Sequence, residues 1–318
     1  MFERKKIGVV VPAHNEELLI GRVIETMPDY VDRIYIVDDC SADQTQARVA
    51  VYLNDRKHKK RLRYIRLEEN KGVGKAIVKG YRKAAEEGMD VVAVMAGDAQ
   101  MDPDDLPAVL APVVRGECDY TKGNRLFTGE AWETIPRYRY LGNATLSLFT
   151  KIASGYWHVA DSQTGYTAIS RAAIETMPLE KLYSRYGYPN HMLVMLNVFN
   201  MRVRDVPVKP VYNIGEKSGI KLRTVVPRIS WLLLKTFLWR MKEKYIIRDF
   251  HPLVLFYGSA LALMVGTLAL GLRLLWRLWE SGSAPPINTL AFMFTAITGV
   301  QFLLFAMWFD MDSNKHLR

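Results

Sequence analysis

Two long stretches without formal charge near the end of the chain constrain its fold more than any other feature. No residue from 250 to 272 carries a formal charge, with His251 taken as neutral, and none does from 281 to 309. Each stretch is long enough to cross about 30 Å of hydrocarbon as a helix. The connection between them is short and polar and carries two tryptophans, a residue type that favours membrane interfaces. We therefore expect a transmembrane hairpin rather than two core helices of a soluble domain.

The charge bias beside this hairpin predicts its orientation. Between residues 202 and 249 there are twelve Lys or Arg and four Asp or Glu. Basic flanks stay on the cytosolic side of a membrane. We expect a multi-pass protein of the cell membrane. Its transmembrane hairpin would cover residues 250–318, with spans at about 252–274 and 287–309 and a short cytosolic tail. The large preceding domain and both termini would then be cytoplasmic.

The segment just before the hairpin has two chemically different sides. Its basic residues lie at seven-residue intervals, and its apolar residues fall on the other side: Arg228, Lys235 and Lys242 against Trp231, Leu234, Leu238 and Met241. This pattern predicts an amphipathic juxtamembrane helix over 223–249 that lies on the bilayer surface. A helix packed on the globular domain is the alternative.

The composition narrows the classes of partner. A formal net charge of +10 favours acidic partners such as phosphates or an anionic membrane face. Only Cys40 and Cys118 occur, so no disulfide framework or Cys-type zinc site is predicted, and a reducing compartment is favoured. The basic run at 56–63 has no interleaved stacking aromatics, which argues against nucleic-acid binding. The apolar run near the N-terminus is short and meets Pro12, so we expect no signal peptide.

The first part of the chain alternates between strand and helix patterns. Apolar runs at 7–11, 33–37, 62–67, 91–95 and 119–122 are separated by segments of helical periodicity. This order predicts an α/β domain over residues 1–222 with a mostly parallel, Rossmann-like sheet covered by helices. Ligands of such sheets bind at the carboxyl ends of the strands.

The strand ends carry the residue types that a nucleotide and a cation require. They read "PAHNEE", "DDCSAD", "ENKGVGK" and "AGDAQMD", and are rich in carboxylates, amides and glycines. The stretch "KGVGKA" lacks the upstream Gly and the Ser or Thr of a Walker loop, and it gives no full dinucleotide fingerprint. A Rossmann oxidoreductase is therefore a weak alternative.

The fourth strand end predicts a metal site. In an extended segment Asp98 and Gln100 would point to the same side, so that both oxygens could face one ion. Mg²⁺ or Mn²⁺ takes oxygen ligands and completes its shell with diphosphate and water. The alternative is that Asp98 is a turn residue. For Asp102, which precedes Pro103, we expect a helix N-cap rather than a ligand.

Together these motifs resemble glycosyltransferase family 2, inverting enzymes with the GT-A fold, and within it the dolichol-phosphate mannose synthase and polyprenyl-phosphate glycosyltransferase branch. The resemblance covers most of the chain, including the hairpin. It implies that "VVVPAHNEE" and "VDDCSAD" surround the nucleotide, with Asp39 at the base. The implied nucleotide-sugar contacts are Pro12, Ala13, Asn15, Glu16, Asp39, Lys71, Gly72, Ala96, Gly97, Asp98 and Lys221. The family's metal motif is usually Asp-x-Asp-x-Gln; this sequence keeps Asp98 and Gln100 but has Ala96 at the first Asp.

The resemblance also implies a site for the acceptor phosphate. "KGNRL" and "IPRYRYLGN" resemble the two family segments whose arginines hold a lipid phosphate, here Arg125 and Arg139, with Arg137 and Asn143 close by. The planar fork of arginine donates two hydrogen bonds to a phosphate and stays charged at any relevant pH. Solvated arginines on a loop are the alternative.

Two further segments match the family more loosely. "DSQTGYTAIS" resembles its Asp-x-x-x-Gly-aromatic segment near the sugar. "YNIGEKSGIKL" resembles a Gly-Glu-Ser-Lys stretch, which would make Lys217, Ser218 or Lys221 a diphosphate contact.

The implied activity is membrane-bound, inverting transfer of a sugar from GDP-mannose or a UDP-hexose to dolichyl or polyprenyl phosphate, for glycan assembly. Asp98, Arg125 and Arg139 would carry the chemistry, with Mg²⁺ or Mn²⁺. The phosphate nucleophile is already anionic, so no strong protein base is needed. A processive polysaccharide synthase is less favoured, because the Gln-x-x-Arg-Trp motif is absent and two spans are few for a translocation channel. A non-catalytic, membrane-tethered nucleotide-binding protein is the third possibility.

Overall fold

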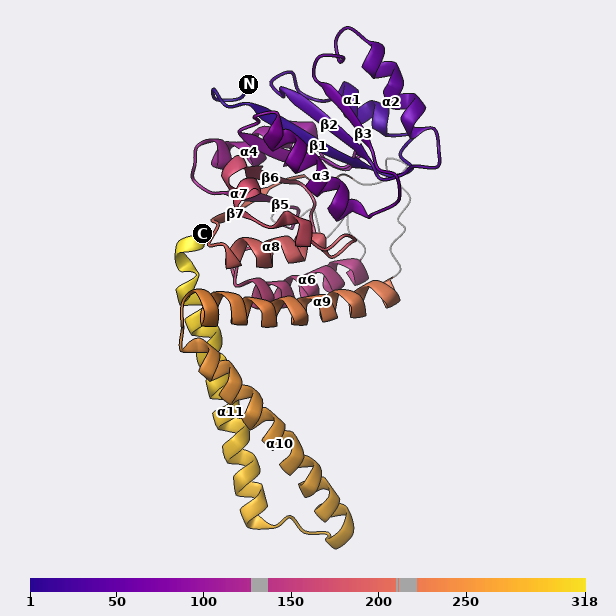
Figure 1. Ribbon diagram of the computed structural model, residues 1–318. Coiled ribbons are helices and arrows are strands. Elements are labelled where there is room, and N and C mark those ends of the chain that lie inside the picture. The colour runs from indigo at the N-terminus through magenta and orange to yellow at the C-terminus, as the bar shows by residue number, and fades with distance from the viewer. Residues whose placement is uncertain (127–136, 210, 212–221) are drawn as a thin grey trace. The chain divides into compact units, whose positions relative to one another are not determined.

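The computed structural model describes residues 1–126, 137–209, 211 and 222–318, with the backbone alone for 137–144 and 222–225 (Figure 1). The chain forms two compact units. The first contains Met1–Phe237 with His316–Arg318, and the second is Leu238–Lys315. The predicted domain boundaries at 222 and 249 remain predictions.

A seven-stranded sheet forms the centre of the first unit, in the order β3-β2-β1-β4-β6-β5-β7. Its strands are β1 (Ile7–Ala13), β2 (Arg33–Asp38), β3 (Leu62–Arg66), β4 (Val91–Val94), β5 (Tyr120–Asn124), β6 (Thr167–Ser170) and β7 (Val203–Pro207). Strand β6 is antiparallel to β4 and β5, and the other pairs are parallel. The predicted mostly parallel α/β sheet is confirmed, and each of the five predicted strands forms within two residues of its expected ends.

Helices cover both faces of this sheet. Besides α9 (Leu222–Lys242), the described α-helices of the first unit are α1 (Ile20–Glu25), α2 (Thr45–Asn54), α3 (Val73–Glu86), α4 (Leu106–Val114), α6 (Arg137–Ser154), α7 (Arg171–Thr176) and α8 (Tyr188–Val198). Val9 and Val11 of β1 pack in one core with α1, α2 and α4, whereas Val10 faces α3. A Cβ on Gly80 of α3 would lie 2.4 Å from Val10 Cγ1, so only glycine permits this approach. Burial on both faces explains the continuous apolar run of β1.

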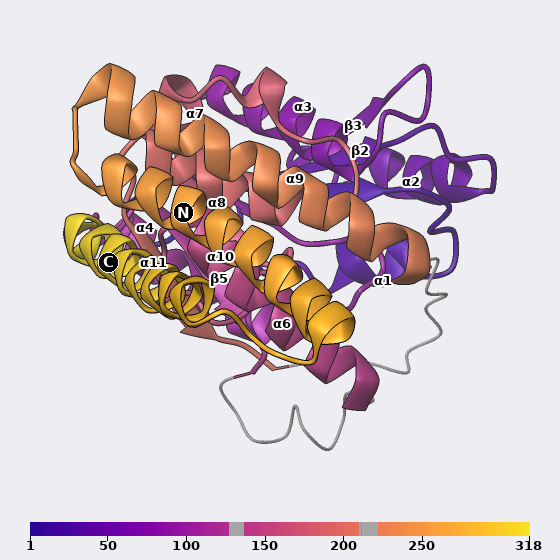
Figure 2. The same ribbon diagram turned by 90° about the horizontal axis from the view of Figure 1, so that it is seen from below.

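Helix α9 (Leu222–Lys242) has features of both predicted arrangements, a helix packed on the globular domain and a helix on the bilayer surface. It buries Ile229 and Leu233, and Leu232 lies against Gly187 of the first unit. Trp231 and Leu234 nevertheless remain exposed, Trp231 at 68%. Figure 2 shows the length of α9 from below. A helix anchored on one side that still presents apolar side chains on the other suits a membrane surface.

One residue of the predicted apolar side of α9 is placed differently. Met241 is buried, while Leu238 is exposed. The helix gives way to a π-helical turn over Glu243–Arg248 directly after this point. The helical spacing still places Met241 on the same side of α9 as Trp231, but Met241 lies in the part of the helix that belongs to the second unit and is buried there.

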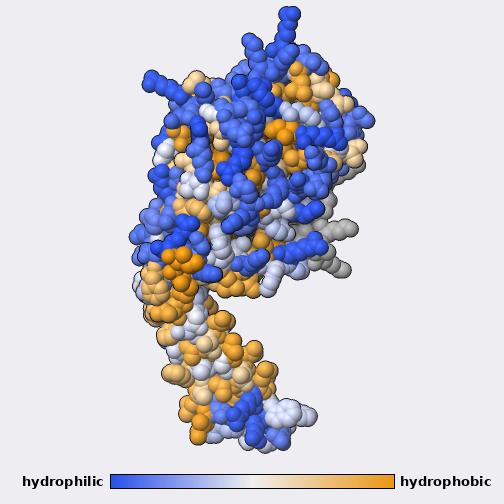
Figure 3. All heavy atoms as spheres, in the orientation of Figure 1, coloured by the Kyte–Doolittle hydropathy of each residue, from blue (hydrophilic) through white to orange (hydrophobic). Residues whose placement is uncertain are grey.

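The second unit contains a helical hairpin. Helices α10 (Leu253–Ser281) and α11 (Pro286–Ser313) run side by side in Figures 1 and 2, and each is long and apolar enough to cross a membrane. Figure 3 shows that hydrophobic residues cover much of the hairpin, with hydrophilic residues near the turn between its helices. Leu268 and Phe294 are about two-thirds exposed, at 65% and 67%. Apolar side chains exposed at this level along helices of this length support a membrane location.

Small and polar residues hold the two helices of the hairpin together. The Thr267 and Thr295 hydroxyls lie 3.0 Å apart. A Cβ on Gly299 would lie 3.2 Å from Leu263 Cβ, so the helices approach closely there. Small residues and hydroxyl hydrogen bonds are the usual means of helix association in lipid.

Candidate active site

A cavity of about 560 Å³ opens at the carboxyl edge of the sheet. Its walls come from the residues that end or follow strands β1, β2, β3, β4, β5 and β7. The antiparallel β6 contributes through Gln163 to Tyr166, which precede it, because its N-terminal end lies at this same edge. The expected position of a ligand on such a sheet therefore coincides with an observed hollow.

Ten of the residues predicted from the sequence line this cavity. On the nucleotide side they are Pro12, Ala13, Glu16, Asp39 and Gly72. At the end of β4 they are Ala96, Gly97, Asp98 and Gln100, and at the end of β5 it is Arg125. Strand ends that are far apart in the sequence thus meet in one place.

Asn15 and Lys71 are not among the described residues that line the cavity. Asn15 has a left-handed φ of +59°, and its side-chain oxygen accepts a hydrogen bond from Ala42 N at 2.8 Å. Lys71 Nζ lies 3.5 Å from the Glu69 carboxylate. The nucleotide contacts of these two residues remain predictions.

Asp39 joins the loops that follow β1, β2 and β3. Its carboxylate is almost fully buried and accepts hydrogen bonds from the backbone N–H groups of Lys71 at 2.7 Å and Gly72 at 2.8 Å. His14 Nδ1 lies 2.8 Å from the Asp39 carbonyl oxygen. A carboxylate has about four lone-pair positions, so one that accepts two backbone bonds can still accept from a ligand.

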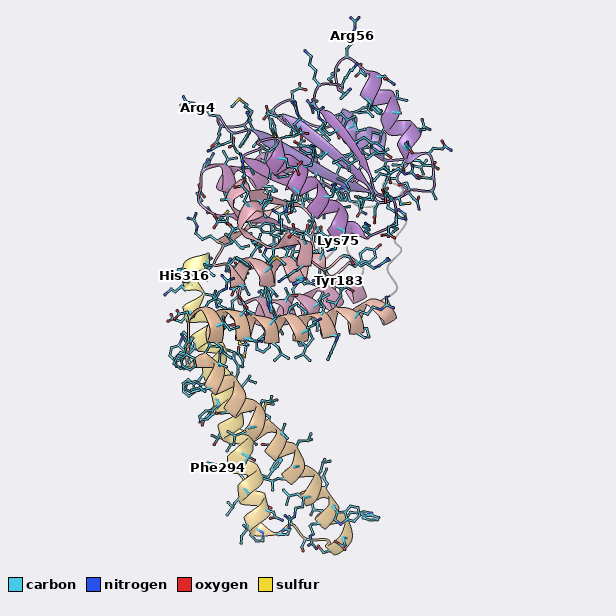
Figure 4. The ribbon with its side chains drawn as sticks, viewed as in Figure 1. Arg4, Arg56, Lys75, Tyr183, Phe294 and His316 are labelled. Carbon is cyan, nitrogen blue, oxygen red and sulfur yellow. The ribbon has the colours of Figure 1, made fainter. Side chains whose placement is uncertain are left out.

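The glycines of "KGVGK" permit a close backbone contact. Gly74 N donates to the Ser184 carbonyl at 2.8 Å, and a Cβ on Gly74 would lie 2.2 Å from the Tyr183 carbonyl oxygen. Figure 4 labels Lys75 and Tyr183, one on each side of this contact. It brings the loop before α8 to the cavity, where Arg185 and Tyr186 form part of the wall.

Asp98 and Gln100 lie in a turn and not in an extended strand. Strand β4 ends at Val94, and Ala99 has a left-handed φ of +57°. The Asp98 carboxylate accepts a hydrogen bond from Gln100 N at 3.1 Å, which closes the turn. The strand-alternation argument for these two residues was therefore wrong, although both of them line the cavity.

Asp102 has the predicted structural role. Its side chain accepts a hydrogen bond from Asp104 N at 3.0 Å, and Pro103 begins the short 3₁₀ helix that leads into α4. The N-cap prediction is confirmed.

The end of β4 is strongly acidic. Burial, the charge of Asp98 and the charge of Asp43 together raise the pKa of Glu16 to about 7. Glu16 lies close to the turn, since a Cβ on Gly97 would be 3.3 Å from its Cγ. A bound cation would relieve this repulsion between carboxylates. Within the described ranges no group of three or more His, Cys, Asp or Glu side chains is arranged to hold a metal.

Arg125 reaches the cavity wall in a fixed geometry. Its Nε donates to Asp161 Oδ2 at 2.8 Å, and its Nη2 donates to Asp161 Oδ1 at 3.3 Å. Asp161 is buried, whereas the Arg125 side chain is 25% exposed. This ion pair was not predicted from the sequence.

Several predicted residues cannot be placed at the level of side chains. Arg137, Arg139 and Asn143 belong to helix α6, of which only the backbone is described at these positions. Lys217, Ser218 and Lys221 lie outside the described residues.

Several residues that line the cavity were not predicted from the sequence, among them His14, Asn70, Gln163, Arg185 and Tyr188. His14 and Asn70 lie inside the quoted strand-end motifs, so position alone could have identified them. Arg185 and Tyr188 lie in "YSRYGYPN", where clustered aromatics with a helix-starting Pro189 were a weak signal.

The sequence matches the model of the family described as glycosyl transferase family 2 over residues 8–177. A UDP-N-acetylglucosamine–dolichyl-phosphate N-acetylglucosaminyltransferase from Methanococcus voltae is 30% identical over 218 residues, which are 65% of this chain and 86% of the relative. An undecaprenyl-phosphate mannosyltransferase from Micrococcus luteus is 26% identical over 71% of this chain and 93% of its own. A dolichol-phosphate mannosyltransferase from Pyrococcus furiosus is 25% identical over 69% of this chain and 60% of its own.

A solved structure shares the fold. Glucosyl-3-phosphoglycerate synthase from Mycobacterium tuberculosis, in complex with Mn²⁺, UDP and glucosyl-3-phosphoglycerate, matches with a TM-score of 0.52 at 21% identity. The match covers 74% of this chain and 80% of that one. At this identity the likeness establishes the fold, which is the GT-A fold predicted from the sequence.

Proposed function

The chain belongs to glycosyltransferase family 2, and from this premise we propose that it transfers a sugar from a nucleotide sugar to a polyprenyl or dolichyl phosphate at a membrane. One observation carries the proposal. Asp98, Gln100 and Arg125 come from two different strand ends and line the same cavity. An acidic end suited to a metal diphosphate and a cationic wall suited to a second phosphate therefore face one space.

The donor would occupy the nucleotide side of the cavity. Pro12, Ala13 and Asp39 line it there, and the Asp39 carboxylate is held by two backbone donors. A carboxylate fixed in this way can select the N–H edge of a base. The candidate donors are GDP-mannose and the UDP-hexoses; the relative from Methanococcus voltae is named for a UDP sugar, and the solved synthase is described with UDP.

The residues at the end of β4 fit a divalent cation. Asp98 supplies a carboxylate and Gln100 an amide oxygen, and beside them the pKa of Glu16 is raised to about 7 by burial and by the charges of Asp98 and Asp43. Mg²⁺ and Mn²⁺ need only one or two protein carboxylates when diphosphate oxygens and water complete their shell. Asp98 and Gln100 would hold the ion, which when bound supplies Lewis-acid stabilisation of the leaving diphosphate. Mn²⁺ accompanies UDP in the description of the solved synthase.

Arg125 and Arg139 would orient the acceptor. An oxygen of the lipid phosphate forms a bond to the anomeric carbon while the bond from that carbon to the nucleoside diphosphate breaks, which inverts the configuration. The phosphate is anionic near neutral pH, so no proton need be removed by the protein. Fixing the two anionic reactants in line removes a large entropic part of the barrier.

The membrane segments would supply the acceptor. Helix α9 exposes Trp231, Leu234 and Leu238, with Arg228 and Lys235 also exposed along it, as a helix on an anionic bilayer surface requires. The α10–α11 hairpin would cross the bilayer twice, with the catalytic domain and both termini in the cytoplasm.

The activity has a direct test. Purified full-length protein, incubated with a panel of radiolabelled nucleotide sugars and a polyprenyl phosphate, should convert one of them into an organic-extractable lipid that releases the sugar on mild acid treatment. Label in a polymer would identify a polysaccharide synthase instead. Nucleotide binding without transfer to any lipid would favour a non-catalytic protein.

The predicted topology can be checked with single cysteines. In a Cys40→Ser background, Ser283→Cys in the turn between α10 and α11 should react with a membrane-impermeant maleimide added to intact cells. Lys315→Cys, just beyond α11, should react only after lysis, because an even number of spans keeps it on the cytosolic side. The reverse pattern would contradict the predicted orientation.

A further inference from the structure

The turn that precedes β6 is held at both of its ends by charged side chains of strands β5 and β7. Lys122 of β5 is fully buried, and its Nζ donates to the Thr164 carbonyl at 2.6 Å. Asp205 of β7 is the register partner of Lys122, and its Oδ2 accepts from Ala160 N at 2.7 Å. The sheet therefore fixes the segment from Ala160 to Thr164 through one cation and one anion.

Asp161 lies between these two attachments, and its carboxylate makes several hydrogen bonds. Oδ1 accepts from Gln163 N at 3.1 Å and from Thr164 N at 3.3 Å, in addition to Arg125 Nη2. Oδ2 accepts from Nε of Arg125 at 2.8 Å, and the Arg125 backbone N–H lies 3.4 Å from it. A side chain held by this many donors cannot rotate without breaking several bonds at once.

The outcome for Arg125 is a defined orientation at the cavity wall. Asp161 takes the Nε and Nη2 edge of the guanidinium, and the backbone of Arg125 is fixed by the end of β5. Arginine has a flexible stem, and an ion pair along one edge of its planar group sets the plane of that group.

We propose that Asp161 is a positioning residue, which holds the Arg125 guanidinium in the orientation that receives the acceptor phosphate, while Lys122 and Asp205 keep Asp161 in place. The proposal rests on the proposed function of Arg125. In this proposal the aspartate of "DSQTG", Asp161, acts through Arg125 on the acceptor side of the cavity.

The state of Asp161 agrees with this role. Burial opposes ionisation of its carboxyl, but the charge of Arg125 and the hydrogen bonds it receives hold its pKa below the usual value. It remains an anion at neutral pH and keeps its ion pair. A carboxylate that acts as a general base needs a pKa raised toward the operating pH, and the pKa of Asp161 is instead lowered.

The test compares Asp161→Asn, Asp161→Glu and Arg125→Ala in the full-length protein, with polyprenyl phosphate and the nucleotide sugar that the donor panel selects. Asp161→Asn should raise the KM for the lipid by about 10-fold to 100-fold, the scale expected when a binding group is misplaced by about 1 Å, with the donor KM unchanged. Asp161→Glu keeps the charge and should recover part of the loss. Asp161→Asn combined with Arg125→Ala should be no worse than Arg125→Ala alone, since both changes remove one interaction.

A second measurement does not depend on turnover. The rate at which phenylglyoxal modifies Arg125, followed by peptide mass spectrometry, should rise in Asp161→Asn, while Arg185 on the same cavity wall serves as internal reference. Unchanged reactivity of Arg125 in Asp161→Asn and Asp161→Glu, at an unaltered melting temperature, would overturn the proposal. Additive losses in the double variant would overturn it as well. A third outcome is that Arg125 becomes more reactive in Asp161→Asn while Arg125→Ala keeps the wild-type KM for the lipid. That outcome would support positioning by Asp161 and reject the proposed function of Arg125.

Discussion

Asp98→Ala is expected to lower turnover at saturating donor on the order of 100-fold to 1000-fold, the range seen when one electrostatic contact to the transition state is removed. Asp98 lines the cavity and is the carboxylate of the proposed metal pair with Gln100. Because Ala96 stands at the first aspartate of the Asp-x-Asp-x-Gln motif that this sequence resembles, the chain has fewer carboxylates at the strand end to share the task. The loss should appear in kcat with either Mg²⁺ or Mn²⁺ present.

The matched control is Asp102→Ala. Asp102 is a carboxylate four positions further along, but it caps the helical segment at Pro103 and is not among the residues lining the cavity. Its loss should cost about 1 kcal/mol of stability and leave turnover near the wild-type value. Near wild-type turnover in Asp98→Ala would show that the metal assignment is wrong. Equal losses in the two variants would point to a folding defect.

Much of the sheet could be predicted because its signals are local. An apolar run such as 7–11, bounded by Pro12 and polar residues, gives a buried strand without reference to the rest of the chain. Strands β6 and β7 were missed. Strand β6 is only four residues long, and β7 is an edge strand that buries only Val203 and Val206, so neither gives a strong apolar run.

The candidate site was predicted residue by residue, but its geometry was not. Parallel strand ends meet at one edge, which is why Asp39, Asp98 and Arg125 could be expected together. The turn at Ala99 depends on a left-handed backbone at a non-glycine residue, which propensity does not indicate. The ion pair of Arg125 with Asp161 joins residues 36 positions apart, and one sequence offers many equally plausible partners for an arginine.

A buried ion pair within the second unit gives the other large expected effect. Arg240, at the end of α9, and Asp310, at the end of α11, are both fully buried, and their two hydrogen bonds are each 2.9 Å long. The Tyr245 hydroxyl and the Asn314 amide donate to Asp310 Oδ1 at 2.8 and 3.0 Å. Lys244 Nζ in turn donates to Asn314 Oδ1 at 2.9 Å. The cluster joins the juxtamembrane segment to the end of the second predicted span.

The charges around this cluster depend on one another. Lys244 is mostly buried, and burial together with the charge of Arg240 lowers its pKa to about 7, whereas Asp310 acts in the opposite direction. Removing the carboxylate would leave the buried Arg240 guanidinium without its counter-ion and would lower the pKa of Lys244 further. Removing one partner of a buried ion pair destabilises a protein strongly, because the other charge stays buried and unpaired. Replacing both partners by apolar residues often changes the stability little.

Asp310→Ala should therefore destabilise the second unit by about 3–5 kcal/mol. Unfolding of detergent-solubilised protein by SDS, followed by circular dichroism, measures the loss. Asp312→Ala, an exposed carboxylate on the same helix, is the matched control and should change stability little. Arg240→Met combined with Asp310→Asn removes both charges and keeps a hydrogen-bond acceptor for Tyr245 and Asn314, so it should be more stable than Asp310→Ala. Equal stabilities of Asp310→Ala and Asp312→Ala would show that the pair does not hold the hairpin to α9.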